Sequence, residues 1–306
     1  NFASKLTRFH LNTDSSVVKF PEIQYICTMT DFEYNQETKI LSMEQKGKTA
    51  SGIIPPNRLL RLDFKSLAKP TFFAVNSLSD TISFNSLNAR YNVTEEFIEA
   101  ENISYIHIAD ALIQPENGKI KIGRRAKIDR LQNAHIAVNN LHLLHSANID
   151  IESVKRYSGS AVYDYVDDIN EIRQISFPEI TVDTMATSAK GFIPAEQKFM
   201  LSSAFTFTGD VSLYSNSKNL QFTGSAGIIH ECGMFESYPV KFKSFIDPKN
   251  VMITLSEKPR DVNDNIVYSG SFMNLDSIHI YPAFLSQQKS WTDIALVRAG
   301  GVLWYN

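Results

Sequence analysis

Two short phrases recur along this chain, and both are typical of β-strands. The first is alanine, any residue, then isoleucine, and it occurs at 111–113, 126–128, 134–136 and 147–149. The second is an aromatic residue, serine or threonine, then glycine, and it occurs at 157–159, 207–209, 222–224 and 268–270. Aromatic and β-branched residues favour pleated, half-buried surfaces, and a glycine within a strand marks a bulge or a position where a side chain does not fit. The phrases therefore predict an all-β chain.

Composition limits the kind of protein this is. The 306 residues are 43% hydrophobic and 21% charged, which is enough apolar matter for a folded core. The formal net charge of −3 offers no basic excess to neutralise a phosphate backbone, so nucleic acid is not an expected partner. No apolar run approaches the roughly 20 residues that a membrane-spanning helix needs. We expect no transmembrane helix.

The region 1–155 is expected to consist of short strands. Segments 17–20 and 23–27 are predicted strands, and 31–34 and 39–43 are predicted to form a hairpin. The leucines of 58–64 fit either a helix or a strand. From 72 to 155, brief apolar pulses are each followed by asparagine, aspartate or glycine, which is typical of β-solenoid rungs. Their irregular spacing leaves a meander of short antiparallel strands as the alternative.

The region 156–306 carries longer strands with clearer alternation. In 205–213, Phe205, Phe207, Val211 and Leu213 share one parity, so one face is predicted to be buried and the other wet. Residues 215–219 have the composition of a loop that joins this strand to 220–224 as a hairpin. An antiparallel β-sandwich-like half suits this pattern. We place a domain boundary near residue 155, with one continuous elongated sheet as the alternative.

Histidine and cysteine positions do not predict a metal centre. His142 and His145 have the spacing of a helical metal site, but on a strand residues three apart point to opposite faces. His230 and Cys232 would need two further ligands, and none lies nearby in the sequence. The two cysteines, Cys27 and Cys232, are read as buried free thiols, with a single long-range disulfide as the alternative.

Two acidic loops invite comparison with calcium sites. Residues 164–171 and 261–265 offer several side-chain oxygens each, whereas calcium requires six to eight oxygens in a loop that can wrap around it. Neither loop has the spacing or the central glycine of an EF-hand. Asp and Asn also build turns by hydrogen bonding to their own backbone, which is the favoured interpretation. No cofactor is predicted, and calcium at 164–171 is retained as a possibility to test.

Tyrosines beside these acids suggest a binding surface. Aromatic rings next to carboxylates can stack on and hydrogen-bond a sugar ring, and the alternative is that the tyrosines pack against one sheet face. The candidate binding residues are Tyr157, Tyr163, Asp164, Tyr165, Asp167 and Asp168. The sequence has no nucleophile elbow, phosphate-binding loop or dinucleotide fingerprint. We therefore predict no catalytic residues and expect a non-enzymatic role.

Three phrases together carry a resemblance to a known class. They are Ile-Ala-Asp-Ala-Leu-Ile-Gln-Pro at 108–115, Tyr-Ser-Gly-Ser-Ala-Val-Tyr-Asp-Tyr-Val-Asp at 157–167 and Phe-Ile-Asp-Pro at 245–248. From about residue 70 onward the chain resembles a segment of the very large, β-rich, uncharacterised cell-envelope proteins of gut Gram-negative bacteria. The resemblance implies an extracytoplasmic location and a longer parent chain, and an aromatic strand under way at 301–306 fits that expectation. Its motifs are structural and transfer no site residues.

Three functions are consistent with these observations. The first is a scaffold or adhesion segment whose partners are other segments of its parent chain or other envelope proteins. The second is a lipid-carrier groove, because a long curled sheet can offer an apolar interior to acyl chains. The third is a carbohydrate-binding or carbohydrate-active β-protein, suggested by the Asn-, Asp- and Tyr-rich surface. Glycan and lipid are thus the expected small ligands.

Overall fold

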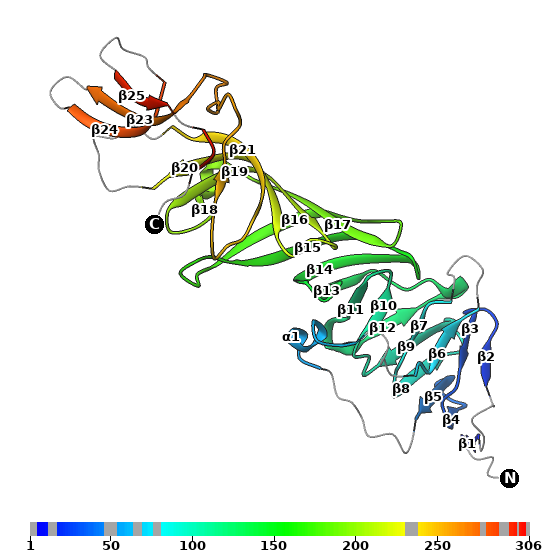
Figure 1. Cartoon of the computed structure of the whole chain (residues 1–306). Coiled ribbons are helices and arrows are strands. Elements are labelled where there is room, and N and C mark those ends of the chain that lie inside the picture. Colours follow the sequence, from blue (N-terminus) through cyan, green and yellow to red (C-terminus); the bar gives the residue numbers. More distant parts are fainter. Residues whose placement is uncertain are drawn as a thin grey trace. The chain divides into compact units, whose positions relative to one another are not determined.

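The computed structural model describes residues 5–11, 17–45, 54–63, 69–75, 81–229, 238–275, 280–287, 294–298 and 300–303. These residues confirm the all-β prediction, because strands joined by short connections account for nearly all of their regular structure (Figure 1). Two compact units are present: residues 1–163, 177–189 and 214–218 form unit 1, and 164–176, 190–213 and 219–306 form unit 2. The division near residue 155 that the sequence suggested stays a prediction.

Unit 1 is built from short strands and a few single helical turns. Up to residue 153 its elements are β1 (Leu6–His10), β2 (Val18–Phe20), β3 (Tyr25–Cys27), β4 (Asp31–Asn35), β5 (Ile40–Glu44), α1 (Pro56–Leu59), β6 (Phe72–Ala74), β7 (Ser83–Phe84), β8 (Asn88–Asn92), β9 (Phe97–Glu101), β10 (Ile106–Ile108), β11 (Ala111–Gln114), η2 (Glu116–Gly118), β12 (Ile120–Ile122), η3 (Arg124–Ala126), β13 (Leu131–Val138) and β14 (His142–Ser153). Strands β15 (Arg156–Val166), β16 (Ile172–Asp183) and β17 (Ala186–Ile193) contribute residues to both units.

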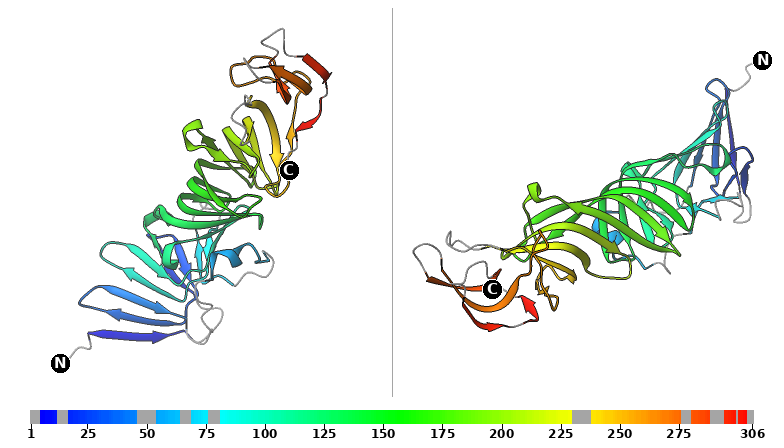
Figure 2. Two further views of the ribbon diagram at one scale, coloured as in Figure 1. Left: turned by 90° about the vertical axis from the view of Figure 1, so that its left-hand side faces the viewer. Right: turned by 90° about the horizontal axis from the view of Figure 1, so that it is seen from above.

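The strands of unit 1 are divided between two sheets. One is six-stranded, in the order β1-β4-β5-β8-β9-β12, and the other runs β2-β3-β6-β7-β10-β11-β13-β14-β15. The chain makes two strands in one sheet and then crosses to the other, so hairpins such as β4–β5 and β8–β9 lie side by side (Figure 2). Every described pairing is antiparallel. The strands of 72–155 are therefore antiparallel, as in the second alternative, but they are divided between two sheets and do not form a single meander.

The core of unit 1 lies between these two sheets. The six-stranded sheet contributes Phe32, Met43 and Ile98, all at most 3% exposed. An edge contact between the rings of Phe20 on β2 and Tyr91 on β8, with centroids 5.0 Å apart, joins the two layers. This is the sandwich-like packing expected when each sheet has one apolar face.

The repeated alanine–isoleucine phrase lies in this core. Ala134 on β13 stands opposite Ala147 on β14, and both are fully buried. Ile113 on β11 faces Ile136 on β13 in the same way. These alanines and isoleucines fill the core with small and large side chains in turn.

The ambiguous segment 58–64 begins in the single turn of α1. Pro56 occupies the first helical turn, where its missing N–H removes no hydrogen bond. Leu59 is fully buried against Leu112 and Ala137 and fixes the turn to the second sheet. None of the helices in the described part of the chain has the length and apolar character needed to cross a lipid bilayer.

Unit 2 contains three sets of paired strands. Its remaining elements are η4 (Ala195–Gln197), β18 (Phe199–Met200), β19 (Phe205–Tyr214), β20 (Leu220–Ile228), β21 (Val240–Ile246), β22 (Ile253–Thr254), β23 (Tyr268–Leu275), β24 (Ile280–Ser286), β25 (Ile294–Arg298) and β26 (Val302–Leu303). Strands β18-β19-β20-β21 are neighbours in that order, β24-β23-β25 form a three-stranded sheet, and β22 pairs with β26.

The predicted hairpin of unit 2 is present, with two copies of the aromatic–hydroxyl–glycine phrase facing each other. The odd-numbered residues of β19 are buried and the even-numbered ones are not, as the alternation predicted. Gly209 on β19 stands directly opposite Gly224 on β20. A Cβ added to Gly224 would lie 2.1 Å from the carbonyl oxygen of Thr208 and 2.8 Å from the Cα of Gly209. The glycines are therefore required by the close approach of two backbones within an unbroken register.

Candidate functional site

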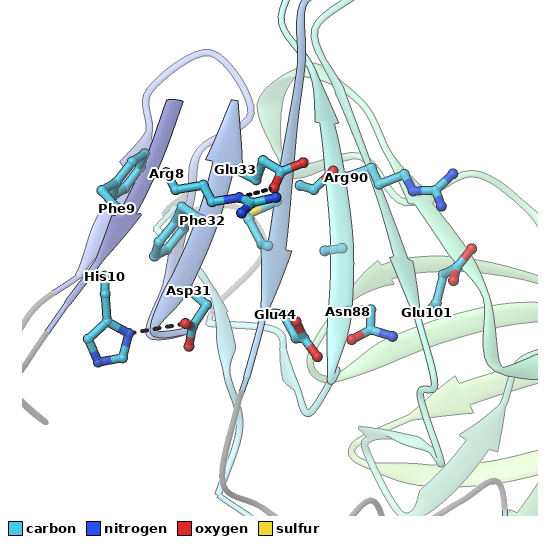
Figure 3. Close-up of a pocket in the computed structure, with 13 residues that line it drawn as sticks. Arg8, Phe9, His10, Asp31, Phe32, Glu33, Glu44, Asn88, Arg90 and Glu101 are labelled. Atoms are coloured by element: carbon cyan, nitrogen blue, oxygen red, sulfur yellow. Dashed lines mark hydrogen bonds and ion pairs between the residues drawn. The ribbon is translucent and has the colours of Figure 1, made fainter. Parts of the chain in front are cut away.

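A hollow of about 820 Å³ lies against the six-stranded sheet of unit 1 (Figure 3). Residues of β1, β4, β5, β8 and β9 line it. Alternation within each strand separates the two faces of this sheet: in β4, Phe32 is buried, whereas Asp31 and Glu33 keep partial exposure. The sheet thus presents its charged side chains on one face and its apolar side chains on the other.

The charged side chains form rows that cross the sheet from strand to strand. Register between neighbouring strands fixes each row, because residues directly opposite each other on an antiparallel pair have Cβ atoms about 5 Å apart. The first row, from one edge of the sheet to the other, is Arg8, Glu33, Ser42, Arg90, Glu99 and Lys121. The second row is His10, Asp31, Glu44, Asn88 and Glu101.

Within these rows, oppositely charged side chains pair across strands. The Nε of Arg8 donates to Glu33, and the Nδ1 of His10 lies 3.2 Å from the Oδ1 of Asp31 (Figure 3). At the far end of the second row, the Nζ of Lys119 donates to the Oε1 of Glu101 at 3.0 Å. Each such exposed pair contributes little to stability, about 0–1 kcal/mol. In the first row basic and acidic side chains alternate around Ser42, whereas the second row is mainly acidic, with Asp31 directly opposite Glu44.

Both edge strands of this sheet are basic. On β1, all five residues are exposed, and Arg8 and His10 pair with acids of β4. On β12, the ammonium of Lys121 lies 3.9 Å from the ring centroid of Phe97, a cation–π contact. The acids of the two rows lie on the inner strands, so a molecule that approaches the β1 edge meets basic side chains first. The outer side of β12 is occupied by residues 127–129, and the backbone N–H of Asp129 donates to the carbonyl oxygen of Lys121 at 2.9 Å.

An apolar hollow of about 410 Å³ adjoins the β1 edge on the opposite face. Phe9 of β1 is 42% exposed there, and its ring stacks on that of Phe32 with centroids 4.8 Å apart. Besides Phe9, the apolar and aromatic residues that line the hollow are Val18, Phe20, Pro21, Tyr34, Leu41, Tyr91 and Val93. The β1 end of unit 1 therefore has a charged surface on one face of the sheet and an open apolar hollow on the other.

The candidate tyrosines of unit 1 are occupied by internal contacts. Tyr157 is fully buried, and its hydroxyl lies 2.8 Å from the Oγ1 of Thr187. Thr187 in turn donates its backbone N–H to the Oδ2 of Asp110 at 2.9 Å and its hydroxyl to the Oδ1 of the same residue. Burial raises the pKa of the Tyr157 hydroxyl. Tyr163 is half-buried, with ring contacts to His142 and Phe177.

Two of the candidate residues in unit 2 are also buried. Tyr165 donates its hydroxyl to the carbonyl oxygen of Leu201 at 2.8 Å. Asp167 is fully buried, and its Oδ2 accepts from the Nε of Arg173 at 3.1 Å. Residues without exposed atoms cannot stack on a ligand, so Tyr157, Tyr165 and Asp167 serve packing and turn formation. For the two tyrosines this is the packing alternative that the sequence left open, because alternation shows which residues share a face but does not show which face is covered.

The other acids of the predicted site keep surface exposure. Asp164 is exposed, and Asp168 accepts from the backbone N–H of Ser203 at 2.8 Å and from its hydroxyl. Partial desolvation acts to raise the pKa of Asp168, but the hydrogen bonds from Ser203 outweigh it and hold the pKa below its usual value. A binding role for Tyr163, Asp164 and Asp168 stays a prediction.

The two acidic loops form the same type of hydrogen-bonded turn. In the first, the Oδ1 of Asp167 accepts from the backbone N–H groups two and four residues later. In the second, the Oδ1 of Asp261 does the same, at 2.9 Å from Asn263 and 2.8 Å from Asn265. Both acids thus cap a five-residue turn, the chemistry that the sequence favoured. Calcium binding at 164–171 stays a prediction.

The described residues of the histidine and cysteine motifs make packing and hydrogen-bond contacts. His142 is buried, with its Nε2 donating to the carbonyl oxygen of Ser217 at 2.7 Å, and His145 lies on the opposite parity of β14. Cys27 is a free, buried thiol, and burial raises its pKa to about 12. His230 and Cys232 lie outside the described residues. Within the described ranges, no group of three or more His, Cys, Asp or Glu side chains is arranged to hold a metal ion.

No known protein family, curated protein sequence or solved structure matches this chain. The charged rows were missed by sequence reasoning, although each contributing segment alternates charged and apolar residues. What the sequence lacked was the order of the strands, since β5 and β8 pair across more than 40 intervening residues.

Proposed function

We propose that the chain is a non-enzymatic, extracytoplasmic structural and binding segment of a larger cell-envelope protein. The observation that carries this proposal is the arrangement of the charged face. Its acids and bases are spread in rows and paired across strands, whereas a catalytic site gathers its reactive groups around one point. Such a patterned face suits contact with other segments of the parent or with other envelope proteins.

The interior supports the same proposal. Large aromatic and aliphatic side chains in both units, including Phe72 in unit 1 and Phe205 in unit 2, are fully buried. A closely packed interior resists deformation, which is what a scaffold requires. The extracytoplasmic location rests on the resemblance of the sequence to β-rich envelope proteins.

The location can be tested by cysteine labelling of the protein expressed from its natural gene. Ser42 is exposed on the charged face, so Ser42→Cys in a Cys232→Ser background provides a reactive thiol, while buried Cys27 serves as the unreactive reference. An extracytoplasmic protein is labelled by a membrane-impermeant maleimide in spheroplasts. Labelling only after lysis would contradict the location, and turnover of glycan, peptide or ester substrates by the purified chain would contradict the non-enzymatic role.

A lipid-carrier role is the second candidate, because one observation favours it. The apolar hollow beside β1 has exposed aromatic side chains, among them Phe9, that could contact an acyl chain. Native mass spectrometry of the chain purified from envelope extracts provides the test. Co-purified phospholipid that is lost in a Phe9→Asp variant supports this role, and a lipid-free chain rejects it.

A further inference from the structure

We propose that the outer edge of β1 binds an extended partner strand in which acidic and apolar residues alternate. This inference rests on the proposed binding function. The partner would extend the six-stranded sheet by one strand. Figure 2 shows β1, in dark blue, as the outermost strand of that sheet. Strand addition of this kind combines backbone hydrogen bonds, which supply affinity, with alternating side chains, which supply specificity.

The backbone of β1 has the geometry that strand addition needs. The backbone N–H of Leu11 donates to the carbonyl oxygen of Thr30 at 2.8 Å, and the backbone N–H of Gln36 donates to the carbonyl oxygen of Lys5 at 3.0 Å. These two bonds identify which residues of β1 and β4 form the hydrogen-bonded pairs. In an antiparallel ladder these pairs alternate, so Thr7 and Phe9 direct their N–H and C=O groups toward β4. Arg8 and His10 direct theirs to the outer edge, where β1 pairs with no other described strand.

Charge on β1 selects the polar side chains of the partner. Residues opposite Arg8 and His10 on an added strand would lie on the charged face, within reach of the Arg8 guanidinium and the His10 ring. On the inner side of β1, strand β4 already provides acids, because it places Glu33 against Arg8 and Asp31 against His10. An acidic strand on the outer side would place the Arg8 guanidinium between two carboxylates and give the His10 ring a second carboxylate neighbour.

The opposite face of β1 selects the apolar side chains. Phe9 is 42% exposed although it stacks on Phe32, because nothing in the described chain covers its outer flank. The partner residue opposite Phe9 would cover that flank. The preferred partner strand therefore alternates acidic and apolar residues, as the sequence Asp-Phe-Glu-Tyr at 31–34 does.

A second copy of this chain does not supply such an edge among its described strands. The other edge strand of the six-stranded sheet carries Lys121. In unit 1, β2 carries Lys19, and in unit 2, β21 carries Lys241 and Lys243. Basic edge residues oppose pairing between these edges, and the edge strands β22, β24, β25 and β26 of unit 2 contain no Asp or Glu, so the acidic partner strand is expected from another molecule.

The test is a binding titration with a labelled octapeptide of the chain's own sequence 29–36, Met-Thr-Asp-Phe-Glu-Tyr-Asn-Gln. Fluorescence anisotropy should show saturable binding to the full chain that weakens as salt is raised. Arg8→Glu should weaken binding about tenfold, because it replaces attraction by repulsion across the new pair. The same peptide with lysine in place of Asp and Glu should bind the wild-type chain poorly and bind the Arg8→Glu chain better.

Matched variants distinguish peptide binding at the β1 edge from peptide binding on the charged face. Arg90→Glu makes the same charge change in the same row, but on an inner strand, and should leave peptide affinity unchanged. His10→Pro removes an outward N–H and should abolish binding, whereas His10→Ala keeps that N–H and should weaken it only a few-fold. Circular dichroism with thermal melting confirms that each variant is folded.

Other outcomes overturn the inference. These are the absence of saturable peptide binding, equal binding of the lysine peptide, equal sensitivity to Arg8→Glu and Arg90→Glu, or an Arg8-dependent dimer of the chain in sedimentation velocity. None of them affects the labelling or turnover results that test the proposed function. The two proposals can therefore fail separately.

Discussion

Replacing Gly209 by alanine should strongly destabilise unit 2. The φ angle of Gly209 is +141°, a conformation that residues with a side chain rarely adopt, and it costs about 1–3 kcal/mol when imposed on one. The added Cβ would also lie 2.5 Å from the carbonyl oxygen of Thr223 and 2.6 Å from the Cα of Gly224. Both contacts are with backbone, so relief requires the two strands to separate.

Strand separation adds to the strain. Each backbone hydrogen bond lost between β19 and β20 costs about 1 kcal/mol, so the total loss for Gly209→Ala is about 4 kcal/mol. Urea denaturation followed by far-UV circular dichroism measures the change. Gly123→Ala is the control, because the Cβ added there would lie 3.9 Å from its nearest neighbour, in an extended backbone. It should stabilise the chain by about 0.5 kcal/mol through the unfolded state.

A double variant tests whether the two glycines act through one contact. Once Gly209→Ala has separated the strands, Gly224→Ala meets less resistance, so the combined loss should be smaller than the sum by at least ~1 kcal/mol. A Gly209→Ala chain within about 0.5 kcal/mol of wild type would refute the close-approach argument. Additive losses would refute the shared contact.

Three further predictions follow from buried polar groups, and urea midpoints measure each of them. Tyr157→Phe should cost about 1 kcal/mol, because it removes the hydrogen bond to Thr187, and a neutral effect would contradict that role. Asp167→Ala should cost about 3 kcal/mol and Asp167→Asn less, because only the alanine removes both the turn cap and the partner of Arg173; equal losses would count against the turn. Burial lowers the pKa of His142, so the stability it confers is complete above the unfolded value of 6.5 and is lost as the pH falls through the lower folded value. Wild type should lose more stability than His142→Gln between pH 7 and pH 5, and equal slopes would contradict this.

Local pattern predicted much of the fold. The hairpin of 31–34 with 39–43 is present as β4 and β5, and the alternation of Phe205 and Phe207 identified the buried face of β19. These features depend on residues close together in sequence, where the two-residue period of a strand is decisive. The phrase that ends in Gly209 was also interpreted correctly as a site with no room for a side chain.

The candidate site could not be predicted in the same way. Tyr157 and Tyr165 look like surface residues beside acids, but other strands cover them, and single-strand periodicity contains no information about covering layers. The charged rows had the opposite problem. Arg8, Glu33 and Arg90 lie on separate strands, and only their pairing order makes them one surface.

Residue-resolved amide exchange by NMR tests the strand-addition proposal most directly. Arg8 and His10 direct their N–H groups outward, whereas Thr7 and Phe9 are already bonded to β4, so adjacent amides of β1 should respond differently to the 29–36 peptide. We expect slower exchange at Arg8 and His10, with little change at Thr7 and Phe9 and none on β8. Unchanged exchange along β1, or protection spread over the charged face, would contradict it.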